Sequence, residues 1–208
     1  MTEPWIPGRR ISVVGCSGAG KTTLARRLAR QLGYRHVELD ALYHQPDWQP
    51  LPTERFQQAV AEALEGDDWV VEGNYSSVRP LVLERADTVI WLDLPRASVM
   101  RQLVLRTLKR VLGRQVLWNG NRERWSNLYS LNPEHSVIAW AWTRYAIHRQ
   151  RYAAEMLNAR PGLRYLHLAS HGAVDALLAR TADRPPGTDA QPARARAGDT
   201  LESMPPLR

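Results

Sequence analysis

Short apolar runs alternate with longer amphipathic stretches along most of this chain. Five of the apolar runs are rich in β-branched residues and predict strands, at residues 10–14, 36–39, 68–72, 88–93 and 163–168. Strands that alternate with helices are typical of a parallel sheet with both faces covered, and strands buried in this way are continuously apolar. We therefore predict an α/β fold: a three-layer sandwich in which a five-stranded parallel sheet lies between helices.

The amphipathic stretches predict the helices that cover this sheet. Apolar residues recur at helical spacing in residues 21–31, 53–64 and 173–179. Gly33 is expected to end the first helix, since glycine is common just beyond the last helical residue. Thr53 is the expected N-cap of the second helix, because a threonine hydroxyl can accept a hydrogen bond from a free amide of the first turn.

Residues 96–158 have a predominantly helical pattern, and we interpret them as a helical lid region within the domain. Asn119-Gly120 and Asn132-Pro133 interrupt the pattern. The second interruption predicts a helix start, since proline fits the first helical position. Residues 119–124 are expected to be the flexible part of the lid, because loops of asparagine and glycine tolerate hinge motion.

The composition changes after residue 182. Residues 184–208 contain five prolines and few large apolar side chains. A segment of this kind buries too little apolar surface to offset its conformational entropy. We predict one domain over residues 1–182 and a disordered tail over residues 183–208.

The composition also bears on cellular location. Cys16 is the single cysteine, so the chain cannot form an internal disulfide, which favours a reducing compartment. No run approaches the roughly 18 apolar residues of a membrane span, and residues 1–10 do not resemble a signal peptide. We expect a cytoplasmic protein with no membrane contact.

The strongest chemical signal is the sequence Gly-Cys-Ser-Gly-Ala-Gly-Lys-Thr at residues 15–22. It matches the pattern G-x-x-x-x-G-K-[ST], in which backbone amides surround phosphate oxygens and the helix that follows directs its positive end at the same anion. The lysine reaches the β- and γ-phosphates, and the threonine hydroxyl completes a Mg²⁺ site. The predicted contacts with ATP and Mg²⁺ are Gly15, Ser17, Gly18, Ala19, Gly20, Lys21, Thr22 and Thr23.

The surroundings of this motif support the same interpretation. It follows a predicted strand and opens a predicted helix, as phosphate binding requires. Lys21 and Lys109 are the only lysines in the chain, so a lysine at this position by chance is improbable. The motif therefore predicts a P-loop NTPase fold.

Candidates for the acceptor side follow the second strand. Asp40 stands at the end of that strand, where ligands of parallel sheets bind, and it can accept a hydroxyl proton or hold Mg²⁺. The alternative for Asp40 is a helix or turn cap. Tyr43, His44 and Trp48 come shortly afterwards and are candidate pocket walls.

Glu72 ends the third strand and is a second candidate for the acceptor side or the outer shell of the metal. A carboxylate at the end of a buried apolar run needs a partner, and a structural ion pair is the alternative. Arg79 is a candidate clamp for an anionic acceptor or a solvated side chain. Asp93 ends the fourth strand, where a structural cap fits at least as well.

Basic residues gather between residues 96 and 151, with eleven Arg or Lys against two acids. Arg106 and Arg110 share one helix face, whereas Arg101 lies elsewhere on the helix. A lid arginine would stabilise the transferring phosphoryl group. A solvated surface and a nucleic-acid-binding face remain the alternatives for the basic region.

These residues together resemble the adenylate-kinase-related P-loop kinases. The resemblance is carried by the phosphate motif, Leu39-Asp40, residues 70–74 and residues 89–95 followed by the arginine-rich helix. Residues 117–123 are similar to a bacterial group labelled topology modulation proteins. The resemblance implies a five-stranded sheet, Mg·ATP and a mobile lid, with Arg106 where the lid arginine begins. The Asp-Gly-Phe-Pro-Arg motif usual in adenylate kinases is replaced here by Glu72-Gly-Asn-Tyr.

The leading hypothesis is therefore ATP-dependent phosphoryl transfer to a small molecule, nucleoside or nucleotide. The predicted catalytic residues are Lys21, Asp40 and Arg106, with Asp40, Tyr43, Glu72 and Arg79 facing the acceptor and Thr22 and Asp40 near the metal. Two alternatives stay open: a nucleotide-dependent regulator that binds DNA through its basic region, and a nucleotide binder without chemistry. The pattern does not distinguish ATP from GTP.

Overall fold

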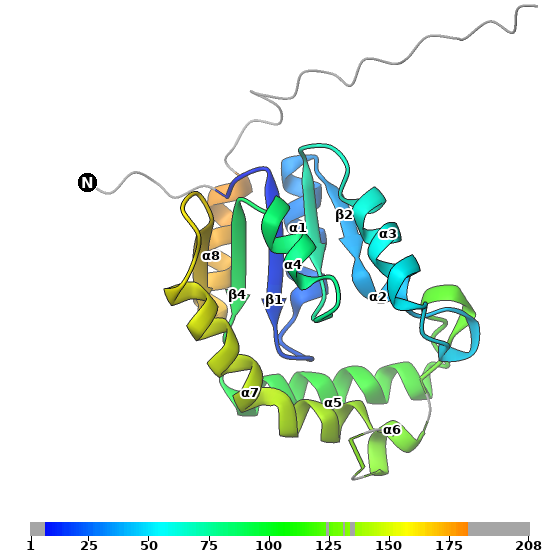
Figure 1. Cartoon of the computed structure of the whole chain (residues 1–208). Coiled ribbons are helices and arrows are strands. Elements are labelled where there is room, and N and C mark those ends of the chain that lie inside the picture. The colour runs from blue at the N-terminus through cyan, green and yellow to red at the C-terminus, as the bar shows by residue number, and fades with distance from the viewer. Residues whose placement is uncertain (1–6, 124, 131, 134–135, 183–208) are drawn as a thin grey trace, which may run out of the picture.

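Five parallel strands form the centre of the computed structural model, which describes residues 7–123, 125–130, 132–133 and 136–182 (Figure 1). In the sheet the strands take the order β2-β3-β1-β4-β5. Their bounds are β1 (Arg10–Gly15), β2 (Arg35–Glu38), β3 (Trp69–Glu72), β4 (Thr88–Leu92) and β5 (Arg164–Leu168). Each strand begins and ends within one residue of its predicted range, and the predicted five-stranded parallel sheet is confirmed.

Helices cover both faces of this sheet. Helices α1 (Lys21–Leu32) and α8 (His171–Ala182) pack together on one face, and α3 (Thr53–Ala63) and α4 (Arg79–Arg85) lie on the other (Figure 1). The strands supply alternate residues to the two cores: Ile11 and Val13 pack on the α1 side, and Val14 packs on the opposite side. This alternation follows from the two-residue period of a strand.

Helix α5 (Arg96–Leu112) crosses the edge at which the strands end, and α7 (Val137–Leu157) runs from that edge onto the α3 and α4 face (Figure 1). Between them lie the short helices η2 (Trp118–Gly120) and α6 (Ser126–Tyr129). The predicted helical section at 96–158 is thus two long helices that flank the carboxyl edge of the sheet. Ligands of parallel sheets bind at this edge.

One predicted helix start and one predicted N-cap are wrong. Helix α7 begins at Val137, because the Ser136 hydroxyl accepts a hydrogen bond from Ala139 N and caps it, so Asn132-Pro133 precedes the helix. Thr53 is the first residue of α3, and Pro52 occupies the cap position. The short helices α2 (Leu39–Tyr43) and η1 (Pro46–Trp48) were not predicted.

The predicted tail at 183–208 lies outside the described residues and stays a prediction, as does the domain range 1–182. Within the part of the chain that the structure describes, none of the helices combines the length and apolarity needed to cross a membrane.

The contact between α5 and the phosphate loop gives a stability prediction. Gly18 and Gly33 both have positive φ, 88° and 72°. A Cβ atom at Gly18 would lie 2.7 Å from the carbonyl oxygen of Val99 and 2.8 Å from Leu103 Cβ, whereas a Cβ at Gly33 would have no atom within 4 Å. Gly33→Ala should lower the free energy of unfolding by about 1–2 kcal/mol through backbone strain alone. Gly18→Ala should cost about 1–3 kcal/mol more, because α5 must shift.

Chemical denaturation of both variants measures the two losses. Equal losses of unfolding free energy in the two variants would show that α5 does not restrict the space around Gly18 in solution.

Candidate active site

The phosphate loop, residues 15–20, joins β1 to α1 at the carboxyl edge of the sheet. Its lysine lies over the loop, with Lys21 Nζ donating to the carbonyl oxygen of Cys16 at 3.3 Å. Asn74 Nδ2 donates to the carbonyl oxygen of Gly15 at 2.6 Å, and Tyr152 OH donates to Asn74 Oδ1 at 2.8 Å. The loop is therefore braced by the β3 end and by α7.

Cys16 packs inside this loop. The thiol is buried, burial raises its pKa, and Sγ lies 3.7 Å from the carbonyl oxygen of Ala141. A buried, protonated thiol is a poor nucleophile, so Cys16 fills space between the loop and α7.

Glu72 joins the end of β3 to the first turn of α1. Thr22 Oγ1 donates to Glu72 Oε1 at 2.8 Å, and Glu72 is only 3% exposed. Burial raises the pKa of this carboxyl, while nearby Lys21 opposes the change. The predicted structural ion pair with an arginine is replaced by this hydrogen bond to the P-loop threonine.

Asp40 lies in the first turn of α2, just beyond β2. Tyr75 OH donates to Asp40 Oδ1 at 2.6 Å and also lies 3.3 Å from His44 Nε2. Burial, together with Asp40, raises the pKa of Tyr75, and burial lowers the pKa of His44. Near neutral pH the phenol of Tyr75 is therefore protonated and the imidazole of His44 is neutral.

Arg106 and Arg110 extend from α5 toward these carboxylates. Burial and the neighbouring Arg110 lower the pKa of Arg106, whose Nε has no hydrogen-bond partner among the described residues. Arg110 Nη1 is paired with Glu123 Oε1 at 3.2 Å. Arg101 is exposed, in agreement with the prediction that it lies on another face.

Two cavities meet at the phosphate loop. The first, here named the strand-end cavity, has a volume of about 540 Å³, and its lining includes Ser17, Lys21, Thr22, Asp40, His44, Trp48, Glu72, Asn74, Tyr75, Arg106, Arg110, Trp118, Glu123 and Asn127. The second, the loop-side cavity, has about 780 Å³, and its lining includes Gly18, Gly20, Thr23, Arg26, His36 and Gln102. Lys21, Thr22, Arg106, Arg110 and Trp118 line both cavities.

Residues 118–122 form a wall of the site together with residues 38–48. Asn119 Nδ2 donates to the carbonyl oxygen of His44 at 2.5 Å, and Asn121 Nδ2 donates to that of Gln45 at 2.9 Å. In return, Trp48 N donates to Asn121 Oδ1 at 2.8 Å. We name this set of contacts the clasp. It holds residues 119–121 against residues 38–48. Motion of residues 119–124 as a lid stays a prediction, and Arg124 lies outside the described residues.

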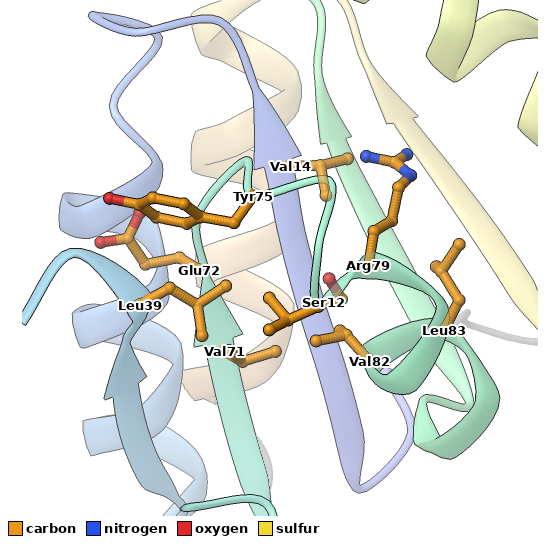
Figure 2. Close-up of a pocket in the computed structure, with 11 residues that line it drawn as sticks. Ser12, Val14, Leu39, Val71, Glu72, Tyr75, Arg79, Val82 and Leu83 are labelled. Atoms are coloured by element: carbon orange, nitrogen blue, oxygen red, sulfur yellow. The ribbon is translucent and has the colours of Figure 1, made fainter. Parts of the chain in front are cut away.

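The structure places two predicted acceptor residues outside the strand-end cavity. Arg79 pairs with Glu155 and lies over the Tyr152 ring, and Figure 2 shows its guanidinium extending away from Glu72 and Tyr75. Its proposed role as an anion clamp is therefore corrected to a structural one. The Tyr43 ring packs against Phe56 and Tyr75, behind the cavity wall.

Other residues of the site were not singled out from the sequence. Asn74 and Tyr75 follow Glu72 after one glycine, in the segment predicted for the acceptor side, but their residue types give no sign of their roles. Glu123 lies within the lid segment that was predicted to be flexible, and nothing in the local pattern marked it as buried in the site.

Some arginines of the basic region contact other side chains of the domain. Arg149 Nε and His167 Nε2 lie 3.0 and 2.9 Å from Asp93 Oδ2, so Asp93 has a structural role as a partner of these two side chains and not as the predicted cap. Arg96 lies over the Trp142 ring. Binding of nucleic acid by the remaining exposed arginines stays an untested alternative.

Comparison with known proteins agrees with this geometry. The family model described as AAA domain matches residues 11–85. Shikimate kinase from Acinetobacter baumannii in complex with shikimate superposes over 84% of this chain and 90% of that one, with a TM-score of 0.50 and 16% identity. The chain has a P-loop NTPase fold.

The curated relatives are small-molecule and nucleotide kinases. Shikimate kinase from Synechococcus elongatus is 28% identical over 141 residues, which cover 57% of this chain and 74% of the relative. Cytidylate kinase from Thermococcus kodakarensis is 27% identical over 150 residues, covering 62% and 75%. The narrower resemblance to topology modulation proteins stays a prediction.

The α7 wall of the site gives a prediction about pH. His148 Nδ1 accepts from Arg151 Nη2 at 2.9 Å, and its ring stacks on Tyr152. Burial, followed by Arg151, lowers the pKa of His148 from 6.5 to about 4. The unfolded chain therefore binds a proton at this residue between these pH values and the folded chain does not, so stability should fall as the pH drops from 6.5 to 4.

The expected loss of unfolding free energy from His148 is on the order of 2 kcal/mol. Denaturation curves at several pH values measure it, and His148→Gln should be less sensitive to pH over this window. An unchanged pH dependence in the variant would contradict the assignment.

Proposed function

We propose that this chain is a kinase that transfers the γ-phosphoryl group of ATP to a hydroxyl group of a small molecule. The observation that carries the proposal is the position of Lys21 and Arg106, which line both cavities. The loop-side cavity includes the outer surface of the phosphate loop and takes the nucleotide. The strand-end cavity contains Asp40 and takes the acceptor.

The phosphate loop holds the donor. Backbone amides of residues 15–20 and the start of α1 surround the phosphates, and Lys21 moves from the Cys16 carbonyl to a phosphate oxygen. The Thr22 hydroxyl, with Glu72 beside it and Asp40 in the same cavity, offers the oxygen ligands that Mg²⁺ prefers. When bound, Mg²⁺ would neutralise phosphate charge. Among the described residues, no three His, Cys, Asp or Glu side chains form a metal site of their own.

The transfer step exchanges one P–O bond for another. The acceptor oxygen forms a bond to the γ-phosphorus while the bond from that phosphorus to the bridging oxygen breaks, and ADP leaves with the bonding electrons. Asp40 takes the hydroxyl proton, and Arg106 balances negative charge on the phosphoryl oxygens. Tyr75 holds the Asp40 carboxylate through its 2.6 Å hydrogen bond.

The chain offers a sharp test of this proposal because it contains only two lysines. Lys21→Ala should reduce both affinity for Mg·ATP and turnover, the latter by about 100-fold or more, since a preorganised cation at the phosphates is lost. Lys109→Ala, on the exposed side of α5, is the matched control and should keep both.

Asp40→Asn separates a kinase from a nucleotide binder. Turnover should fall by about 100-fold while affinity for Mg·ATP is retained, because the proton acceptor is lost but the phosphate loop is intact. The assay measures ATP- or GTP-dependent phosphorylation of a panel of nucleosides, nucleotides and hydroxylated metabolites. If no acceptor raises turnover above slow ATP hydrolysis, the proposed activity is wrong.

A further inference from the structure

The strand-end cavity contains a carboxylate that the proposed transfer does not use. Glu123 enters the cavity from the segment that follows the clasp, and its side chain is only 7% exposed. Arg110 Nη1 lies 3.2 Å from Glu123 Oε1, and Asn127 Nδ2 donates to Glu123 Oε2. Two partners, one on α5 and one on α6, therefore fix this carboxylate in the cavity wall.

The formal charges of the side chains that line the cavity balance before any ligand binds. Among the described lining residues, the cations are Lys21, Arg106 and Arg110, and the carboxylates are Asp40, Glu72 and Glu123. Burial keeps His44 neutral by lowering its pKa. Mg·ATP brings net negative charge and engages Lys21 and Arg106, which lie at the junction of the two cavities.

An anionic acceptor would therefore enter a cavity that is already negative. The third cation, Arg110, also lines both cavities and is paired with Glu123. Arg79 pairs with Glu155 outside the cavity. Burying a charge without a partner is costly, and like charges at close range repel.

Aromatic rings form much of the remaining wall. Trp48 and Trp118 line the cavity, and their indole N–H groups donate to the carbonyl oxygen of Arg122 and to Glu38 Oε2. The polar edges of both rings are engaged within the protein, and the Trp118 ring also stacks with His44 and lies beneath Arg110. Sites that combine aromatic ring surface with a few fixed polar groups suit compact, partly apolar ligands.

We propose that the acceptor is a hydroxylated compound with no negative charge, such as a sugar, a polyol, a nucleoside or an amino derivative of one, and that Glu123 is the residue that excludes anions. The inference rests on the proposed kinase activity. The proposed uncharged acceptor differs from the substrates that the names of two relatives state, since shikimate is a carboxylate and cytidylate is a phosphate ester.

Sets of acceptors that are similar in shape but differ in charge test the inference. One set is glucosamine, glucose and glucuronate, and a second is cytidine with cytidine 5′-monophosphate. Phosphoryl transfer is measured with Mg·ATP, and binding is followed by tryptophan fluorescence with a non-hydrolysable ATP analogue, because Trp48, Trp118 and Trp140 line the cavity. The neutral or cationic member of at least one set should exceed its anionic partner by about tenfold in affinity or in kcat/KM.

Preference for the anionic member of the sets that respond would overturn the inference and leave the kinase proposal standing. So would a lack of binding by every neutral and cationic member while the nucleotide analogue binds. Charge-selective binding without any transfer from ATP would instead support the inference about the cavity and count against the kinase proposal.

Glu123→Gln examines the residue itself. The change keeps the shape of the side chain and frees Arg110 from its ion pair, so affinity for glucuronate or cytidine 5′-monophosphate should rise by about tenfold relative to the neutral partner. Glu65→Gln, at an exposed position beyond α3, is the matched control and should leave this ratio unchanged. A merely structural role for Glu123 would alter stability without changing the ratio, and that result would overturn its assignment.

Discussion

The contact between α5 and Gly18 determines how the site is built. The phosphate loop leaves no room for a side chain there, and Val99 and Leu103 of α5 lie directly against the glycine. Because a helix advances by a fixed rise per residue, anchoring α5 at this point also fixes where Arg106 and Arg110 lie. The loop and the arginines, far apart in the chain, thereby reach one phosphate-binding region.

The carboxyl edge of a parallel sheet gives the other half of the geometry. β1, β2 and β3 all end at this edge, so the phosphate loop, Asp40 and Glu72 come together without any special local sequence. The Thr22–Glu72 hydrogen bond then ties α1 to β3. The phosphate loop, Asp40 and Glu72 consequently lie on one edge of the same sheet.

Sequence reasoning was most successful where one physical rule dominates. Buried strands require continuous apolar runs, so all five strands were located, and the phosphate motif fixes a loop between a strand and a helix. Lys21, Thr22, Asp40, Glu72 and Arg106 accordingly line the cavities that the pattern predicted. Single-turn elements such as α2 and η1 carry too few residues for a periodic pattern and were missed.

The acceptor side depends instead on contacts between distant segments. Arg79 could face an anion or pair with a carboxylate, and only the position of Glu155 on α7 decides between them. Likewise, residues 119–123 look solvent-exposed in the sequence, but Asn121 is buried and the Glu123 side chain is only 7% exposed. The partner Trp48 of Asn121 lies 73 positions away, and the partners of Glu123 lie on neighbouring helices. Side-chain partners of this kind leave no periodic trace in a single sequence.

The clasp should make substitutions in residues 38–48 depend on substitutions in residues 118–122. Asn121 both donates to residues 38–48 and accepts from them, so neither segment can change its backbone path alone without leaving a buried amide unpaired. Substitutions near Trp48 should therefore be matched by substitutions near Asn121 among homologues, and a new acceptor preference would arise through paired changes in both segments.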